Sequence, residues 1–308
     1  MSVTLDRKSR ATTRKSLPGP IGFIGAGKVG TALASLFHAR GVDVVAVSGR
    51  TSRRSISMAL AADLKPSAAQ PRADTLLAAN ILFLTVPDDA IEPLCREIAE
   101  VGGWRRGQGV VHCSGALPSD VLQAARDAGA LVASFHPLQA FASLDAALEN
   151  MPGSTFALEG DAELVAQLDK LVNVLGGTAI HLKAEEKTLY HVAAAIASNY
   201  TVTLASLASE LLVREGIAPD ANTALRYLLP LLKGTVDNLD LLGLPDALTG
   251  PLARGDAGTV ARHIEALEEC APDLAGIYRH LARLTLPLAR QKGRLDDATM
   301  QKLKDELD

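Results

Sequence analysis

A glycine-rich turn near the start of the chain has the spacing of a dinucleotide-binding site. Gly25, Gly27 and Gly30 form the pattern G-x-G-x-x-G directly after an apolar run. The first glycine permits a tight turn, the second lets a pyrophosphate approach the backbone, and the third lets a helix pack closely on a strand. Free N–H groups at the start of that helix favour phosphate. The residues expected at the pyrophosphate are Gly25, Ala26, Gly27, Lys28, Val29 and Gly30.

The end of the next apolar run selects between the nicotinamide dinucleotides. NAD-binding proteins usually carry Asp or Glu there, whereas this chain reads Ser48-Gly49-Arg50-Thr51. No carboxylate would repel a 2′-phosphate, and the Arg50 guanidinium can form paired hydrogen bonds with one. Ser48 and Thr51 are further donors. The pattern predicts NADP as the cofactor, the alternative being a solvated basic turn.

A third candidate segment for the cofactor is Val86-Pro87, which follows the buried run Ile81–Thr85. A strand that ends in Val-Pro leads into an irregular loop at the carboxyl edge of a parallel sheet. We expect Val86 and Pro87 to line the nicotinamide ribose. The alternative is a strand that Pro87 simply terminates.

Ser114 and His136 are candidates for chemistry because each follows a predicted strand. Both should lie at the carboxyl edge, on the side of the nicotinamide. Hydride transfer to a carbonyl needs a group that protonates the developing alkoxide, and imidazole serves near neutral pH with its ordinary pKa of about 6.5. We therefore predict a catalytic or substrate-binding role for both residues. The alternative is that His136 only ends its strand before Pro137.

A later helix carries polar residues at four-residue spacing in an apolar setting. Lys187, His191, Ala195 and Asn199 lie on one slowly rotating face. Buried polar groups need partners, and a substrate can supply one for His191 and Asn199. An interhelical hydrogen bond would satisfy them equally well. No cluster of side chains predicts a metal site.

The elements that position these residues form an α/β pattern followed by helices alone. We expect an N-terminal arm over residues 1–18, a Rossmann domain with a doubly wound, mostly parallel sheet over 19–183, and an all-helical domain over 184–308 that serves substrate binding and dimerisation. Predicted strands are Ile21–Gly25, Asp43–Val47, Ile81–Thr85, Val110–His112, Leu131–Phe135 and Thr155–Leu158. Predicted helices include Glu185–Glu215, Ala221–Leu232, Asp256–Glu269, Asp273–Leu286 and Asp296–Leu307, with Asp256, Asp273 and Asp296 as N-caps. Trp104 to Arg106 should form an exposed turn.

Composition narrows the classes of protein that fit. The net charge of -4 gives no general attraction to nucleic acid, and three scattered cysteines favour neither disulfides nor structural zinc. The basic N-terminus lacks the apolar segment of a secretory signal. The most apolar stretch, residues 191–212, holds polar residues at its centre, which favours a helix buried in protein over a membrane span. We expect a cytoplasmic protein.

Several motifs together resemble a known superfamily. The glycine turn, Thr85-Val86-Pro87-Asp88 and the helical second half resemble β-hydroxyacid dehydrogenases, ketopantoate reductases, pyrroline-5-carboxylate reductases, prephenate dehydrogenases and coenzyme-F420-dependent NADP oxidoreductases. The segments 112–115, 135–139, 190–200 and 248–256 resemble more narrowly the family that joins a Rossmann-like domain to domain of unknown function 2520. That resemblance, which covers nearly everything after Pro18, implies bound NADP(H) and a homodimer. Ser114 and His136 resemble the substrate-contacting Ser and His of prephenate dehydrogenases.

One departure from the superfamily affects the mechanism. β-Hydroxyacid dehydrogenases and ketopantoate reductases carry Lys-x-x-x-Asn on the corresponding helix, whereas this chain has Ala195 four residues before Asn199. His136 or His191 must then replace that lysine as the acid. The leading interpretation is a reductase or dehydrogenase for a small carboxylate that bears a carbonyl, hydroxyl or imine. Hydride exchange with the deazaflavin F420, or a non-catalytic NADP sensor or assembly protein, are the alternatives.

Overall fold

In a computed structural model, described for residues 17–293 and 295–308, the chain forms two compact units that divide between Ile196 and Ala197. Of the expected N-terminal arm, residues 1–16 lie outside the described residues. The sheet occupies the first unit, and its last strand ends at His181. The first unit also takes in the start of the helix that follows, up to Ile196.

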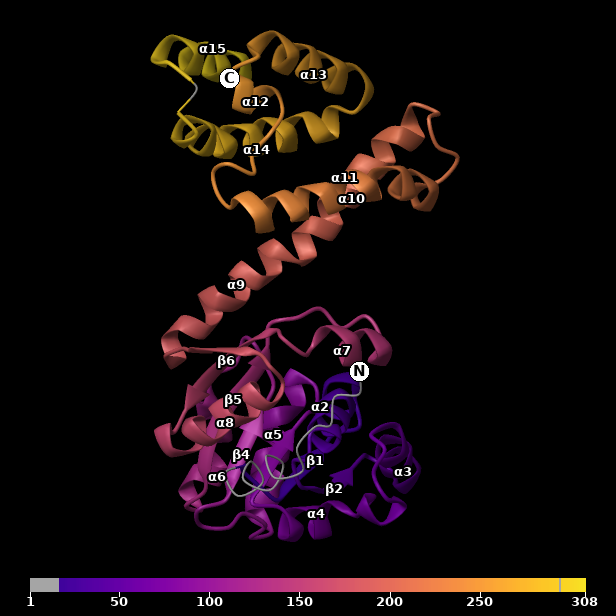
Figure 1. The fold of residues 1–308 in the computed structure, drawn as a ribbon, viewed down its shortest axis with the longest axis vertical. Helices are drawn as coiled ribbons and strands as arrows, with labels where there is room; N and C mark the ends of the chain where they lie inside the picture. The colour runs from indigo at the N-terminus through magenta and orange to yellow at the C-terminus, as the bar shows by residue number, and fades with distance from the viewer. Residues whose placement is uncertain (1–16, 294) are drawn as a thin grey trace, which may run out of the picture. The chain divides into compact units, whose positions relative to one another are not determined.

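The first unit contains a seven-stranded sheet in the order β2-β1-β3-β4-β5-β6-β7 (Figure 1). Every neighbouring pair is parallel except β5 and β6, which are antiparallel. The predicted Rossmann fold class is therefore confirmed. The strands are β1 (Ile21–Ile24), β2 (Val44–Ser48), β3 (Ile81–Leu84), β4 (Gly109–His112), β5 (Leu131–Pro137), β6 (Thr155–Gly160) and β7 (Thr178–His181). The sequence patterns did not predict the edge strand β7.

Helices cover both faces of the sheet because its strands are apolar on both sides. Five phenylalanine rings line one face, with neighbouring centroids 5.0 to 6.4 Å apart: Phe23, Phe37, Phe83, Phe135 and Phe156. That face packs against α2 (Lys28–Ala39), α3 (Ser52–Ala61), α7 (Leu144–Asn150) and α8 (Ala162–Val174). The other face packs against α4 (Arg72–Ala78), α5 (Asp88–Glu100), the 3-10 turn η2 (Ser119–Leu122) and α6 (Gln123–Asp127).

Trp104 corrects one prediction for this second face. Its side chain is buried among α5, α6 and the sheet, and its indole N–H donates to the Cys95 carbonyl at 2.9 Å. The turn over 104–106 is therefore not exposed throughout. Arg105 and Arg106 are exposed, whereas the indole fills a core position.

The stretch Glu185–Glu215, predicted as one or two turns and then a long helix, forms three elements. The 3-10 turn η3 (Ala184–Glu186) leads into α9 (Lys187–Ala197), and Ser198 separates it from α10 (Asn199–Arg214). By length and composition, Ala184–Arg214 could cross a membrane, and only 11% of its most apolar stretch is buried. The single chain therefore leaves this stretch mostly exposed, and its burial inside protein stays a prediction.

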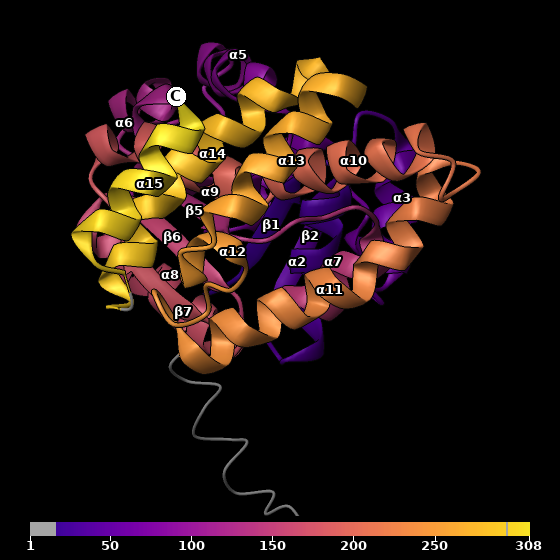
Figure 2. The ribbon, with the colours of Figure 1, turned by 90° about the horizontal axis from the view of Figure 1, so that it is seen from above.

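The second unit is helical throughout its described residues. Its elements are α10, α11 (Ala221–Leu242), α12 (Pro251–Arg254), α13 (Ala257–Cys270), α14 (Pro272–Gln291) and α15 (Asp297–Leu307). Helices α13, α14 and α15 pack around one small core (Figure 2). Helix α11 accommodates Pro230 and continues ten residues beyond the predicted end at Leu232.

Two of the three predicted aspartate caps are confirmed. Asp256 accepts a hydrogen bond from the Thr259 N–H at 3.0 Å, and Asp296 accepts one from the Thr299 N–H at 2.8 Å. The prediction for Asp273 is wrong, because α14 begins one residue earlier at Pro272. Asp273 instead forms an ion pair with Arg214 of α10.

Candidate functional site

The glycine turn between β1 and α2 is built by close approaches that only glycine allows. Gly25 has φ of 121°, and a Cβ there would lie 2.5 Å from the Thr85 carbonyl oxygen. A Cβ on Gly30 would overlap the Thr85 hydroxyl and lie 2.6 Å from the Gly25 carbonyl oxygen. The Thr85 hydroxyl also donates to that carbonyl at 2.7 Å. Gly25 and Gly30 are therefore fixed by packing between the ends of β1 and β3.

Gly27 differs from the other two glycines because it faces open space. A Cβ there would have no neighbour closer than 3.7 Å. Gly27 is the N-cap of α2, and without a side chain it offers no cap to the amides of the first turn. Those N–H groups are therefore free to bind an anion.

A cleft of about 880 Å³ lies at the carboxyl ends of β1 and β2. The strand order reverses between β1 and β3, which is where open α/β sheets bind their ligands. Five of the predicted cofactor residues line it together: Gly25, Ser48, Arg50, Thr51 and Val86. Its lining does not include the other predicted residues, namely Ala26, Gly27, Lys28, Val29, Gly30 and Pro87. Lys28 instead donates to the Ala142 carbonyl at 2.7 Å.

The donors around this cleft fit a phosphorylated adenosine. Arg50 is exposed at the tip of β2 and makes no hydrogen bond within the described chain. Thr51 caps α3 by accepting from the Arg54 N–H at 3.3 Å. Farther along the cleft, no donor among the described residues reaches the buried Gln70 Oε1. The cleft therefore combines a free guanidinium with an unsatisfied acceptor, as a phosphate and an adenine amino group require.

A second group of polar side chains joins β5 to the first turns of α9. The His136 Nδ1 lies 2.9 Å from the Tyr190 hydroxyl, and the two rings meet edge to face. The His191 ring centroid is 6.1 Å from that of His136. Gly115 lies against both imidazoles, since a Cβ there would be 2.7 Å from His136 Nε2 and 2.8 Å from His191 Nδ1. His136 and His191, both predicted, thus share one site with Tyr190.

Ser114 lies beside this cluster, but its hydroxyl is occupied. The hydroxyl donates to the Asp88 carboxylate at 2.7 Å. It also accepts from the N–H groups of Ala116 and Leu117, at 3.2 and 3.1 Å. Ser114 therefore holds the loop after β4 in shape, and contact with a substrate would require it to give up one of these bonds.

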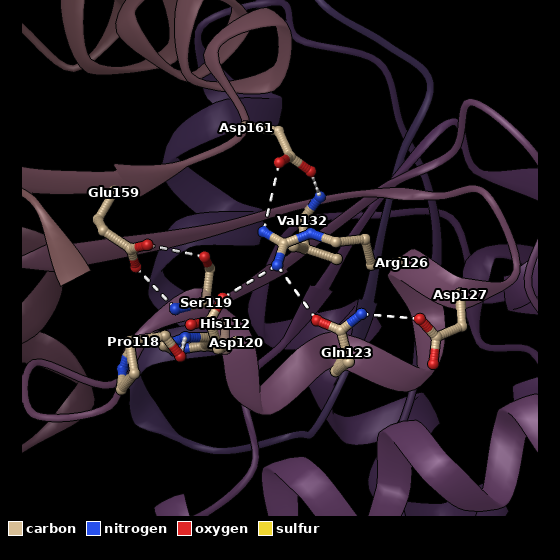
Figure 3. Close-up of polar contacts among 10 residues, drawn as sticks. All are labelled: His112, Pro118, Ser119, Asp120, Gln123, Arg126, Asp127, Val132, Glu159 and Asp161. Atoms are coloured by element: carbon tan, nitrogen blue, oxygen red, sulfur yellow. Dashed lines mark hydrogen bonds and ion pairs between the residues drawn. The ribbon is translucent and has the colours of Figure 1, made fainter.

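Buried polar contacts also hold the two ends of this loop, at His112 and at Ser119 (Figure 3). His112 accepts from the Ser114 N–H at 3.1 Å and donates through Nε2 to the Pro118 carbonyl at 3.2 Å. The Glu159 carboxylate of β6 accepts from both the N–H and the hydroxyl of Ser119, each at 2.7 Å. Residues 112–119 are thus fastened to the sheet at both ends.

Burial governs the protonation of the histidines in this region. Desolvation, followed by the charges of Lys187 and His191, lowers the pKa of His136 to about 4. The pKa of His112 falls to about 3, again through burial first and Lys187 second. Burial raises the pKa of Tyr190 to about 12. At neutral pH His136 is therefore a neutral imidazole bonded to a neutral phenol.

The sequence patterns missed Tyr190 as a site residue and gave no role to Lys187. Lys187 is wholly buried, and its amine donates to the Ser114 carbonyl at 3.1 Å and to the Ser134 hydroxyl. The four-residue spacing of Lys187 and His191 was the available signal. Asn199, the remaining predicted site residue, begins α10 in the second unit and is exposed.

Two family models match consecutive parts of the chain. A Rossmann-like domain matches residues 8–137, and the domain of unknown function DUF2520 matches residues 154–285. The chain therefore contains a Rossmann-like domain followed by a DUF2520 domain. The resemblance predicted from the motifs is thereby confirmed. No curated protein matches the chain.

Solved structures share this arrangement. A Thermotoga maritima protein is 25% identical, with a TM-score of 0.68 over 89% of this chain and 100% of its own. A Bacteroides fragilis protein provisionally classed as an NADP oxidoreductase is also 25% identical, with a TM-score of 0.66 over 87% of this chain and 98% of its own. A reductive aminase from Aspergillus terreus, solved with NADPH and ethyl-5-oxohexanoate, is 19% identical, with a TM-score of 0.53 over 93% and 91%. At 19% identity, the similarity to the reductive aminase shows a shared fold alone.

Proposed function

We propose that this protein is an NADP(H)-dependent oxidoreductase acting on a small carboxylate that bears a carbonyl, hydroxyl or imine. The observation that carries the proposal is the cleft at the switch point, where the glycine turn and Arg50 line one cavity. The Bacteroides fragilis relative, classed provisionally with NADP oxidoreductases, supports the same class of reaction. When bound, a nicotinamide dinucleotide supplies or accepts the hydride.

NADP is preferred to NAD in this proposal because of the charges at the tip of β2. Arg50 is free to pair with a 2′-phosphate, and the turn 48–51 carries no carboxylate. Ser48 is nearly buried, so its side chain contributes less than the sequence suggested. The first-turn amides of α2, which Gly27 leaves uncapped, bind the pyrophosphate.

The proton-handling pair is Tyr190 and His136. Since His136 is neutral at physiological pH, the imidazolium acid expected from sequence is scarce there. When His136 Nδ1–H donates to the phenol oxygen, the Tyr190 O–H is free to donate to a substrate oxygen or nitrogen. When the phenol donates to Nδ1 instead, the proton at Nε2 faces Gly115 and His191. His191, exposed beside the pair, is a candidate to bind the substrate carboxylate.

We also propose that the protein is a cytoplasmic homodimer that binds neither nucleic acid nor membrane. Helices α10 and α11 support the dimer because they expose apolar side chains along their length, among them Val202, Leu231, Val236 and Leu241. A second copy that packs against these two helices would bury such side chains.

Calorimetry with NADPH and NADH, followed by NADPH oxidation with a panel of 2-oxo acids and cyclic imines, tests this function. We expect NADPH to bind at least tenfold more tightly than NADH, and Arg50→Ala to remove that preference with little effect on NADH. Tyr190→Phe should lower kcat by about 10²-fold. If the protein binds neither dinucleotide, the proposal is refuted. Tight binding of NADPH without turnover of any substrate would favour a non-catalytic NADP sensor.

A further inference from the structure

Lys187, the first residue of α9, has an environment that stability alone does not explain. Its side chain has no exposed surface, and within residues 17–293 and 295–308 its amine donates only to the Ser114 carbonyl and the Ser134 hydroxyl. No carboxylate among the described residues comes within ion-pair distance of this amine. Burying an ammonium costs free energy that two neutral acceptors offset only in part. An apolar side chain of similar length would fill the position at lower cost.

The acceptors of Lys187 connect it to the candidate site. The Ser114 carbonyl belongs to the peptide that leads into Gly115, and Gly115 lies against the imidazoles of His136 and His191. Ser134 lies two residues before His136 on β5. One amine therefore fixes both the loop that faces the imidazoles and the strand that carries one of them.

The charges around the amine and the imidazole come from several elements. His136 is faced by Lys187, Tyr190 and His191 from α9, and by His112 from the end of β4. Lys187 is faced by Glu159 of β6, by Cys113 after β4 and by Asp88 of α5. The Glu159 carboxylate is already occupied by Ser119, and that of Asp88 by Ser114. Neither carboxylate forms an ion pair with the amine among the described residues, so no contact neutralises the ammonium next to the histidines.

We propose that Lys187 is a positioning residue of the proton-handling pair, which fastens Ser114 and Gly115 against His136 and His191 and places a positive charge behind them. This inference rests on the proposed function. The charge disfavours a second positive charge on His136, so the pair starts each turnover with the imidazole neutral and the Tyr190 proton in place. The lowered pKa of Lys187, about 8 through burial, leaves most of the amine charged at neutral pH.

The test replaces Lys187 with Met, which keeps the length of the side chain and removes the charge. Imidazole NMR of the protein without substrate, assigned with His136→Asn, follows the titration of His136. We expect its midpoint to rise by about one pH unit, as removal of a nearby charge predicts. The melting temperature should stay equal or rise, whereas kcat/KM at pH 7 should fall about tenfold with NADPH affinity unchanged. Lys170→Met, which removes an exposed lysine from α8 of the same unit, should change none of these.

An unchanged His136 midpoint in a folded Lys187→Met protein overturns the inference. If that variant does not fold, Lys187→Gln keeps a donor for the Ser114 carbonyl without the charge, and the same shift is expected. If neither variant folds, Lys187 is structural and the inference is overturned. A shifted midpoint in a protein that binds no dinucleotide would refute the proposed function while leaving the coupling intact. NADPH-dependent turnover together with an unchanged His136 midpoint would support the proposed function and overturn the inference about Lys187.

Discussion

The two units of the chain bury their apolar residues to very different extents. The sheet unit encloses five of the six phenylalanines in one continuous stack and packs helices on both faces. In the second unit, only α13, α14 and α15 share a buried core, while α10 and α11 expose leucines and valines. The first unit therefore completes its own core, whereas the second leaves apolar surface exposed in the single chain.

The largest effect expected from this contrast concerns paired glycine substitutions, one in each unit. Gly30→Ala forces a Cβ onto the Thr85 hydroxyl and the Gly25 carbonyl, so the sheet unit should lose about 3 kcal/mol. Gly276→Ala in α14 meets nothing within 4 Å and should gain up to about 1 kcal/mol through helix propensity. Urea unfolding measures both, with Trp104 fluorescence reporting on the sheet unit. Equal losses in the two variants would contradict the contrast.

A smaller effect should follow from charges on the exposed face of the second unit. Leu231→Glu with Leu241→Glu places two carboxylates on α11, where both leucines are largely exposed in one chain. We expect the dimer dissociation constant to rise about 100-fold, which corresponds to about 2.7 kcal/mol. Sedimentation velocity measures this change.

The control for that pair is Leu77→Glu on α4, a leucine of similar exposure that belongs to the other unit. It should leave the oligomeric state unchanged. A protein that sediments as a monomer before any substitution would remove the proposed interface altogether.

The patterns that predicted the first unit were local, which explains their success. The glycine spacing, the apolar runs and the absence of a carboxylate after Ser48 each act within a few residues, and the strand–turn–helix order followed from them. The edge strand β7 escaped prediction because Thr178–His181 is short and partly exposed, with little apolar pattern. The extent of α11 escaped because Gly234, a weak helix former, follows the predicted end at Leu232, although contact with α10 sustains this helix.

The site depended on contacts that no local pattern encodes. Tyr190 and His136 are 54 residues apart, and their hydrogen bond exists only because α9 starts beside the end of β5. The four-residue spacing of Lys187 and His191 did not indicate that the lysine is buried, because a lysine in the first turn of a helix is ordinarily solvated. The tertiary structure, and not the spacing, buries it.

The smallest of the three expected effects is a loss of stability of the sheet unit at acidic pH. His112 is buried and neutral, with a pKa of about 3, against about 6.5 in the unfolded chain. Because the unfolded state binds the proton first, stability is complete above pH 6.5 and falls as the pH drops toward 3. The loss between pH 7 and pH 5 should be about 2 kcal/mol from this group alone.

Urea unfolding monitored by Trp104 at the two pH values measures this loss. His112→Gln keeps an acceptor and a donor but cannot titrate, so it should flatten the dependence. If His112→Gln loses as much stability between pH 7 and pH 5 as the original chain, other titratable groups cause the acid sensitivity.

The burial of Trp104 also gives the chain a natural spectroscopic reporter. It is the only tryptophan in the sequence and belongs to the sheet unit, while Cys270 is the one fully exposed thiol among three and ends α13. Cys95 is buried, and the pKa of Cys113 rises to about 12 through burial, so alkylating dyes should select Cys270. A fluorophore attached there reports on the helical unit while the indole reports on the sheet unit, so the unfolding of each unit can be followed separately in the unmutated protein.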